Sequence, residues 1–142
     1  MEIVIINKEK ISRKKLKEII RFSRPSNITI PKIYIRKVNS FSFYGAYYYP
    51  TGRPRRIYAS VGRCEAFPTF VIRNKRGRRQ GYSTDFWIYS QEEALVYLLS
   101  HELKHHYQST FGLPYSEREA DSYALRKLER WRKRKIKKLS QG

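Results

Sequence analysis

The chain has 142 residues, which is enough for one compact domain and too few for two. Its 31 Lys and Arg residues far exceed its 12 Asp and Glu residues, and the resulting formal net charge of +19 favours polyanionic partners such as nucleic acid. Hydrophobic residues make up 40% of the chain and aromatic residues 15%, so it is not a disordered basic arm.

The cysteine count and the apolar segments narrow the possibilities further. Cys64 is the only cysteine, which excludes a disulfide within the chain and a multi-cysteine zinc site. No apolar segment approaches the ~20 residues of a membrane span, and the apolar stretch 3–6 is too short for the core of a signal peptide. We therefore expect a soluble, cytoplasmic protein in which any metal ion is bound by His and carboxylate groups.

The first half of the chain predicts one helix and several short strands. Residues 2–6 alternate weakly and predict a strand, and apolar residues then recur at helical spacing from Ile11 to Phe22, which predicts a helix that ends before Pro25. Between 28 and 61, β-branched and aromatic residues alternate, and prolines and glycines divide this segment into short strands. Two further strands, roughly 67–72 and 82–89, flank a glycine-containing polar segment that suits a hairpin connection.

Two capping boxes predict the helices of the C-terminal part. Ser90 and Glu93 can satisfy free amides at the start of a helix that we expect from about 91 to 108. Ser116 and Glu119 repeat the pattern and predict a last helix toward the C-terminus. This order of elements predicts an α+β fold with the helices packed on a mainly antiparallel sheet. We expect one domain over 1–142 with a basic C-terminal tail from about 132.

The helix predicted at 91–108 contains His101-Glu102-Leu103-Lys104-His105, which matches the HExxH motif of zinc peptidases. Histidines four residues apart lie on one face of a helix and can direct two imidazoles at one metal ion. Glu102 lies about 100° around the helix from His101, close enough to act as a general base without binding the metal. A chance match is the alternative, but residues 94–99 are apolar all round and predict a buried helix, in which His and Glu side chains need partners.

A catalytic zinc site needs three protein ligands, and Glu117 is the candidate for the third. Glu119 is rotated by about 200° from Glu117 and should face solvent. Asp121 lies one turn beyond Glu117 and could accept the free N–H of a histidine ligand. An acid-rich helix N-terminus, stabilised by the helix macrodipole, also explains these carboxylates, but it does not explain their alignment with the apolar face. The residues that share this face with Glu117 are Ala120, Asp121, Ala124, Leu128 and Trp131.

These two motifs together resemble the gluzincin family of zinc peptidases. His101–His105 followed by Glu117–Asp121 is similar to the paired signature of that family, and the Glu-x-x-Ala-Asp form is similar to HtpX-type peptidases. In its short length the chain resembles the soluble minigluzincins instead. The membrane helices typical of HtpX-type proteins are absent from the sequence, so the resemblance does not imply that subfamily's membrane role. The resemblance covers roughly residues 65–131, and the third histidine that SprT-type proteases would use is not found downstream of His106.

The resemblance implies a zincin architecture, with an active-site helix under a sheet whose edge strand binds an extended peptide. It implies a zinc metalloendopeptidase in which one Zn²⁺ is bound by His101, His105 and Glu117. Glu102 would be the catalytic base of hydrolysis by a zinc-bound water, and Asp121 would contact a ligand from behind. The segment 66–70 occupies the place of the substrate-binding edge strand.

Two questions stay open at this point. The first is which residue stabilises the oxyanion, because His106, Tyr107 and Tyr115 are all near the motif and no spacing selects one of them. The second is the role of the basic clusters, which either bind nucleic acid or form solvated helix faces. The candidates for polyanion binding are Arg76, Arg78, Arg79, Arg132, Lys133, Arg134 and Lys135.

Two alternatives to an active peptidase follow from these features. The chain could be an inactive zincin-fold protein that binds nucleic acid through its basic surface. It could also be a latent enzyme in which Cys64 or the C-terminal tail covers the cleft, although a lone cysteine is ordinarily a small hydrophobic residue. The zinc content and a Glu102→Gln variant distinguish an active peptidase from the first alternative.

Overall fold

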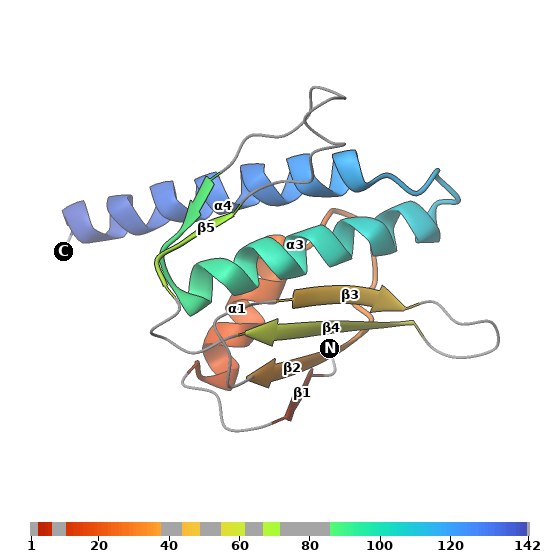
Figure 1. The fold of residues 1–142 in the computed structure, drawn as a ribbon, viewed down its shortest axis with the longest axis horizontal. Coiled ribbons are helices and arrows are strands. Elements are labelled where there is room, and N and C mark those ends of the chain that lie inside the picture. Colours follow the sequence, from red (N-terminus) through yellow and green to blue (C-terminus); the bar gives the residue numbers. More distant parts are fainter. Residues whose placement is uncertain are drawn as a thin grey trace.

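The computed structural model of the protein describes residues 3–6, 11–37, 44–48, 55–61, 67–71 and 86–141. Over these ranges the chain forms six strands and three helices (Figure 1). In chain order they are β1 (Ile3–Ile6), α1 (Arg13–Ser23), β2 (Lys32–Lys37), β3 (Tyr44–Tyr48), β4 (Arg56–Val61), β5 (Thr69–Val71), β6 (Phe86–Ile88), α3 (Gln91–Thr110) and α4 (Glu117–Gln141).

The main sheet has four strands in the order β1-β2-β4-β3. Strand β2 pairs in parallel with both β1 and β4, whereas β3 pairs antiparallel with β4 and forms one edge of the sheet. The α+β class is confirmed, but the expectation of a mainly antiparallel sheet is wrong, because the sheet is mixed. Helix α1 connects β1 to β2 and provides the crossover that this parallel pair needs, and β2 also pairs in parallel with β4, which follows β3 in the chain. Strands β5 and β6 form a separate antiparallel pair, as expected for a hairpin.

One face of the four-stranded sheet packs against helices. The inward side chains of β2 and β4 alternate with outward ones, and Ile33, Ile35 and Ile57 are completely buried. They share one core with apolar residues of α1 and α3, such as Leu16 and Leu99. Helix α4 packs on the other side of α3, so α3 lies between the sheet and α4 (Figure 1). This explains why residues 94–99 of α3 are apolar all round.

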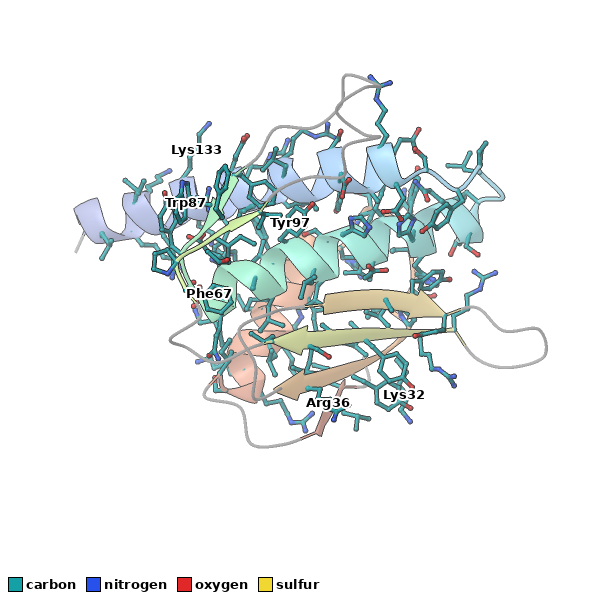
Figure 2. All side chains as sticks on the ribbon, in the orientation of Figure 1. Lys32, Arg36, Phe67, Trp87, Tyr97 and Lys133 are labelled. Carbon is teal, nitrogen blue, oxygen red and sulfur yellow. The ribbon has the colours of Figure 1, made fainter. Side chains whose placement is uncertain are left out.

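The opposite face of the sheet carries polar and aromatic side chains. Tyr34 of β2 and Tyr58 of β4 stack with their ring centroids 4.6 Å apart. Lys32 and Arg36 project from this face, away from α3 (Figure 2). None of the helices described combines the length and the apolar content that crossing a membrane requires.

The two predicted capping boxes begin α3 and α4. Oγ of Ser90 accepts a hydrogen bond of 3.1 Å from the amide of Glu93. The carboxylate of Glu93 accepts one of 3.1 Å from the amide of Tyr89. Oγ of Ser116 likewise accepts from the amide of Glu119 at 3.1 Å, and α4 then begins at Glu117. These caps fix the starting points, and hence the rotational phase, of the two helices that carry the candidate site.

Candidate metal centre

Three potential metal ligands meet where α3 passes the start of α4. Nε2 of His101 lies 3.1 Å from Nε2 of His105, because the two residues are about one helical turn apart. Oε1 of Glu117 lies 2.7 Å from Nε2 of His105, and Oε2 of Glu117 lies 3.3 Å from Nε2 of His101. The ligand atoms of the three residues all lie within 4.8 Å of one another. The predicted metal ligands are therefore neighbours, and together they can hold a metal ion.

The spacing of these atoms suits a tetrahedral ion. Zinc, with bonds of about 2.0–2.1 Å, separates its ligand atoms by roughly 3.3 Å, and the three separations observed here are 2.7, 3.1 and 3.3 Å. Two imidazole nitrogens and one carboxylate oxygen are also a donor set of catalytic zinc sites, in which a fourth position stays open. The residues present therefore fit a zinc ion.

Glu102 lies beside the three ligands on the buried side of α3. Its Oε1 is 3.9 Å from Nε2 of His101, which is too far for a hydrogen bond but close enough to reach a small molecule between them. Burial raises the pKa of Glu102 above its ordinary value, and the neighbouring His101 and His105 oppose this effect. A carboxylate whose pKa is raised toward neutrality is suited to general-base chemistry.

Asp121 lies next to the ring nitrogen of His101 that points away from the other candidate ligands. Its Oδ1 lies 3.0 Å from Nδ1 of His101, although the two groups are not aligned as an ideal hydrogen bond. The hydroxyl of Tyr97 donates to the same oxygen at 3.1 Å. Burial lowers the pKa of His101, but Asp121 and Glu117 outweigh burial and raise this pKa to about 9. Asp121 therefore occupies the position that the sequence suggested for it, behind a candidate ligand.

Gln108 plays the corresponding part for the second histidine and was not anticipated from the sequence. Its Oε1 lies 2.9 Å from Nδ1 of His105, which makes His105 an Nδ1–H donor and leaves Nε2 free for a metal. The side-chain amide of Gln108 donates to the carbonyl of Ser116 at 3.1 Å and to Oε2 of Glu119 at 3.3 Å. This buried glutamine thus connects the histidine to the start of α4. Its position one turn beyond His105 was the available sequence signal.

The sequence left three candidates for oxyanion stabilisation, His106, Tyr107 and Tyr115, and the structure places only one of them at the site. Tyr115 lies at the site: its ring stacks on His105 with centroids 4.2 Å apart, and its hydroxyl donates to Oε1 of Glu117. His106 points away from the site: its Nδ1 lies 2.9 Å from the hydroxyl of Tyr47 in β3, and its Nε2 lies 2.9 Å from the carbonyl of Thr29 before β2. Tyr107 lines a different hollow on the far side of α3. Tyr115 is therefore the candidate for oxyanion stabilisation.

A hollow of about 310 Å³ connects the site to the edge of the sheet. It is lined by residues 45–48 of β3 together with His101, Glu102 and Glu117. An adjoining hollow of about 240 Å³ is lined by Tyr47, Leu113 and other residues around the turn between α3 and α4. The candidate site thus opens onto a groove beside β3.

The edge strand beside the site is not the one that the resemblance suggested. Residues 69–71 form β5, which pairs with β6 in the separate two-stranded sheet, and Ala66 lies outside the described residues. The strand next to the site is β3, because the β3–β4 pairing places it outermost, on the side where α3 runs. Gly45, a glycine within a strand pattern, was the sequence signal for this close approach of backbone to helix.

Three of the seven basic residues proposed for polyanion binding are paired with carboxylates. Arg76, Arg78 and Arg79 lie outside the described residues. The segment from 132 is the end of α4 and not a separate tail. Arg132 contacts Glu93 at 2.7 Å, Arg134 contacts Glu18 at 3.0 Å and Lys135 contacts Glu92 at 3.1 Å. The fourth, Lys133, is exposed, forms no ion pair with a carboxylate among the described residues, and projects away from the body of the protein (Figure 2).

Comparisons with known proteins add nothing to this description. No protein-family model matches the sequence, and neither the curated proteins nor the solved structures contain a significant match. The functional interpretation of this chain therefore depends on the residues of the site and their geometry.

Proposed function

We propose that this protein is a zinc-dependent metallopeptidase of the gluzincin type. The observation that carries the proposal is the convergence of His101, His105 and Glu117 at ligand distances, with the carboxylate of Glu102 beside them. Chance placement of an HExxH sequence does not explain why a glutamate twelve residues further on approaches both histidines. It also does not explain why each histidine contacts a polar group, Asp121 or Gln108, through its other ring nitrogen.

In this proposal each residue around the ligands has one task. A zinc ion held there supplies a Lewis acid that lowers the pKa of water to about 7 and polarises a carbonyl group. Glu102 takes the proton from the attacking water at its carboxylate and delivers it to the nitrogen of the leaving amine. The hydroxyl of Tyr115, which reaches Glu117, donates a hydrogen bond to the oxyanion of the tetrahedral intermediate.

The groove beside β3 supports a peptide as the substrate. Strand β3 forms an edge of the sheet, and its far side has no strand partner among the described residues. An extended peptide can pair with such an edge through main-chain hydrogen bonds while its side chains enter adjacent hollows. The hollow lined by Tyr47, Leu113 and Tyr115, together with polar residues such as Gln108, would receive one of these side chains.

Metal analysis combined with two variants tests the proposal. The purified protein should contain about one zinc ion per chain, and His105→Ala should abolish this binding. Glu102→Gln should keep the zinc ion, because Glu102 is not a ligand, but it should lower the rate of peptide hydrolysis by about 10² or more. Hydrolysis is measured by mass spectrometry of a peptide mixture after incubation.

The same measurements can reject the proposal. If the wild-type protein binds no divalent metal under any loading condition, the proposed metal centre is ruled out. If both proteins bind zinc and Glu102→Gln hydrolyses peptides as fast as the wild type, Glu102 is not the base, and the activity comes from a contaminating peptidase.

A further inference from the structure

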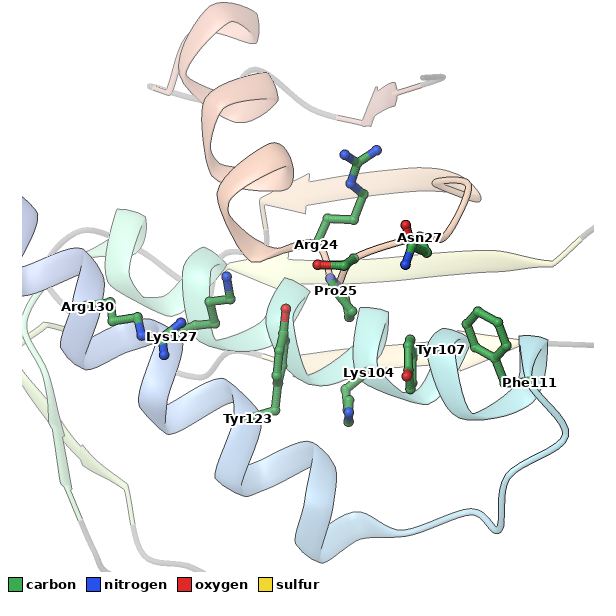
Figure 3. Close-up of a pocket in the computed structure, with 10 residues that line it drawn as sticks. Arg24, Pro25, Asn27, Lys104, Tyr107, Phe111, Tyr123, Lys127 and Arg130 are labelled. Atoms are coloured by element: carbon green, nitrogen blue, oxygen red, sulfur yellow. The ribbon is translucent and has the colours of Figure 1, made fainter.

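A second hollow, of about 500 Å³, lies between α3, α4 and the turn that follows α1 (Figure 3). It shares no lining residue with the metal centre or with the groove beside β3. Its walls come from segments far apart in the sequence, namely residues 24–27, 104–111 and 123–130. The metallopeptidase proposal gives this hollow no role.

Four cations line this hollow, and no acidic residue does. Arg24 comes from the turn after α1, Lys104 from α3, and Lys127 and Arg130 from α4. Within the described part of the chain, none of the four forms an ion pair with a carboxylate. This contrasts with the C-terminal end of α4, where three of four neighbouring cations are paired.

Two of these cations, Lys127 and Arg130, are close enough for their charges to repel each other. Burial lowers the pKa of Lys127, and the neighbouring positive charge of Arg130 lowers it further. Nζ of Lys127 lies 5.6 Å from the ring centroid of Tyr123, so it is held over an aromatic face instead of next to a carboxylate. Like charges that are brought together without counter-charges cost free energy, and a bound anion would recover it.

Aromatic rings form the other end of the hollow. Phe111 is 49% exposed at the end of α3, and its ring centroid lies 4.8 Å from that of Tyr107. Nζ of Lys104 lies 4.3 Å from the centroid of Tyr107 and connects the aromatic end to the cationic end. Figure 3 shows Tyr107 and Phe111 side by side at one end, with Lys127 and Arg130 toward the other.

We propose that this hollow is a binding site for single-stranded nucleic acid. Proteins that bind single strands without sequence readout combine cations that contact phosphates with aromatic rings on which bases stack. Here Lys127, Arg130 and Arg24 contact the phosphates, and the exposed ring of Phe111 stacks on a base. A duplex fits less well, because its bases already stack on one another. The formal net charge of +19 attracts the polyanion to the protein. This inference does not depend on peptidase activity.

Two variants of equal charge test the site against a diffuse electrostatic effect. Lys127→Gln/Arg130→Gln removes two charges from the hollow, and Lys14→Gln/Arg36→Gln removes two exposed charges elsewhere. Binding of a fluorescent oligothymidylate of about ten nucleotides, within the usual site size, is followed by anisotropy. The first variant should bind the oligonucleotide at least about tenfold more weakly, and its slope of log K against log salt concentration should be shallower by about 1.4. The second variant should change the affinity by less than about twofold.

Two further measurements test the aromatic contact and the form of the ligand. Phe111→Ala should weaken binding by about fivefold or more, because one stacked base is lost. A hairpin duplex with the same number of phosphates should bind more weakly than the single strand. Arg24→Gln, on a different segment, repeats the charge test if the double variant on α4 unfolds, which thermal melting reveals.

Several outcomes would overturn the inference. Equal loss in the two charge-matched variants would indicate non-specific attraction by the whole surface. A wild-type protein that fails to bind the oligonucleotide at low salt would exclude the site. Displacement of the oligonucleotide by millimolar inorganic phosphate, with no effect of Phe111→Ala, would show that the hollow binds small anions only.

Discussion

Gly45 of β3 lies so close to Glu102 of α3 that a β-carbon at position 45 would stand 3.3 Å from Oε1 of the Glu102 carboxylate. The same β-carbon would also lie 3.2 Å from Cδ2 of Leu98. The absence of a side chain at Gly45 therefore allows β3 and α3 to approach each other, with the carboxylate of the proposed base between them.

Gly45→Ala should displace this carboxylate by a few tenths of an ångström without touching the metal ligands. Because catalysis by a positioned base is sensitive to small displacements, we expect kcat to fall by about tenfold. Peptide hydrolysis under saturating zinc measures this change. The zinc content of the variant is its internal control and should equal that of the wild type. Wild-type kcat in the variant would show that the contact with Gly45 does not position the base.

Asp121→Asn should weaken zinc binding by about 10–100-fold, because the carboxylate that orients His101 and increases its basicity is lost. Competition with a chromophoric chelator gives the zinc affinity. Glu129→Gln is the matched control, since it removes one exposed carboxylate from the same helix and should leave the zinc affinity unchanged. A loss of affinity of the same size in both variants would indicate that only the net charge matters.

Tyr115→Phe keeps the ring that stacks on His105 and removes the hydroxyl that reaches Glu117. If this hydroxyl stabilises the oxyanion, kcat should fall by about 10² with little change in KM or in zinc content. Tyr107→Phe provides the comparison, because Tyr107 lies in the other hollow and should not affect hydrolysis. A purely structural Tyr115 would instead lower thermal stability and leave the kcat of the folded fraction unchanged.

The metal-free protein should lose stability as the pH rises from 6.5 through about 9. Asp121 and Glu117 raise the pKa of His101 from 6.5 to about 9 despite its burial, so the folded state keeps a proton that the unfolded state releases. The stabilisation is fully present below pH 6.5 and disappears above about 9, with an upper limit of about 3 kcal/mol. Urea unfolding after chelation, near pH 6.5 and above pH 9, measures this difference. His101→Gln should flatten the dependence, and an unchanged slope in that variant would assign it to other groups.

The sequence predicted correctly those features that depend on helical periodicity or on contacts within one helical turn. The start of α4 and its 100° step per residue determine where Glu117 and Asp121 point, and the observed contacts agree with that phase. The capping residues Ser90 and Ser116 also act within one turn, which is why both helix starts could be predicted.

Features that depend on contacts between distant segments could not be predicted in this way. Which strand forms the edge beside α3 depends on the pairing of β3 with β4, and Gly45, although it allows a close approach to α3, does not determine that pairing. Counting charges identified the basic stretch from 132, but it could not show that Arg134 has Glu18, 116 residues away, as its partner. Tyr115 lies in a turn without periodicity, so its place at the site depends on the path of the turn.

The two adjacent histidines at the end of the motif are not interchangeable. His106 donates from Nε2 to the carbonyl of Thr29 and accepts at Nδ1 from the hydroxyl of Tyr47, at 2.9 Å in each case. Both of its ring nitrogens therefore form hydrogen bonds that connect α3 to the edge strand β3 and to the segment before β2. The protein consequently has no third imidazole available for an ion. Loss of His105 cannot be compensated by its neighbour, and loss of His106 would weaken the wall of the groove beside β3 while the three candidate ligands stay in place.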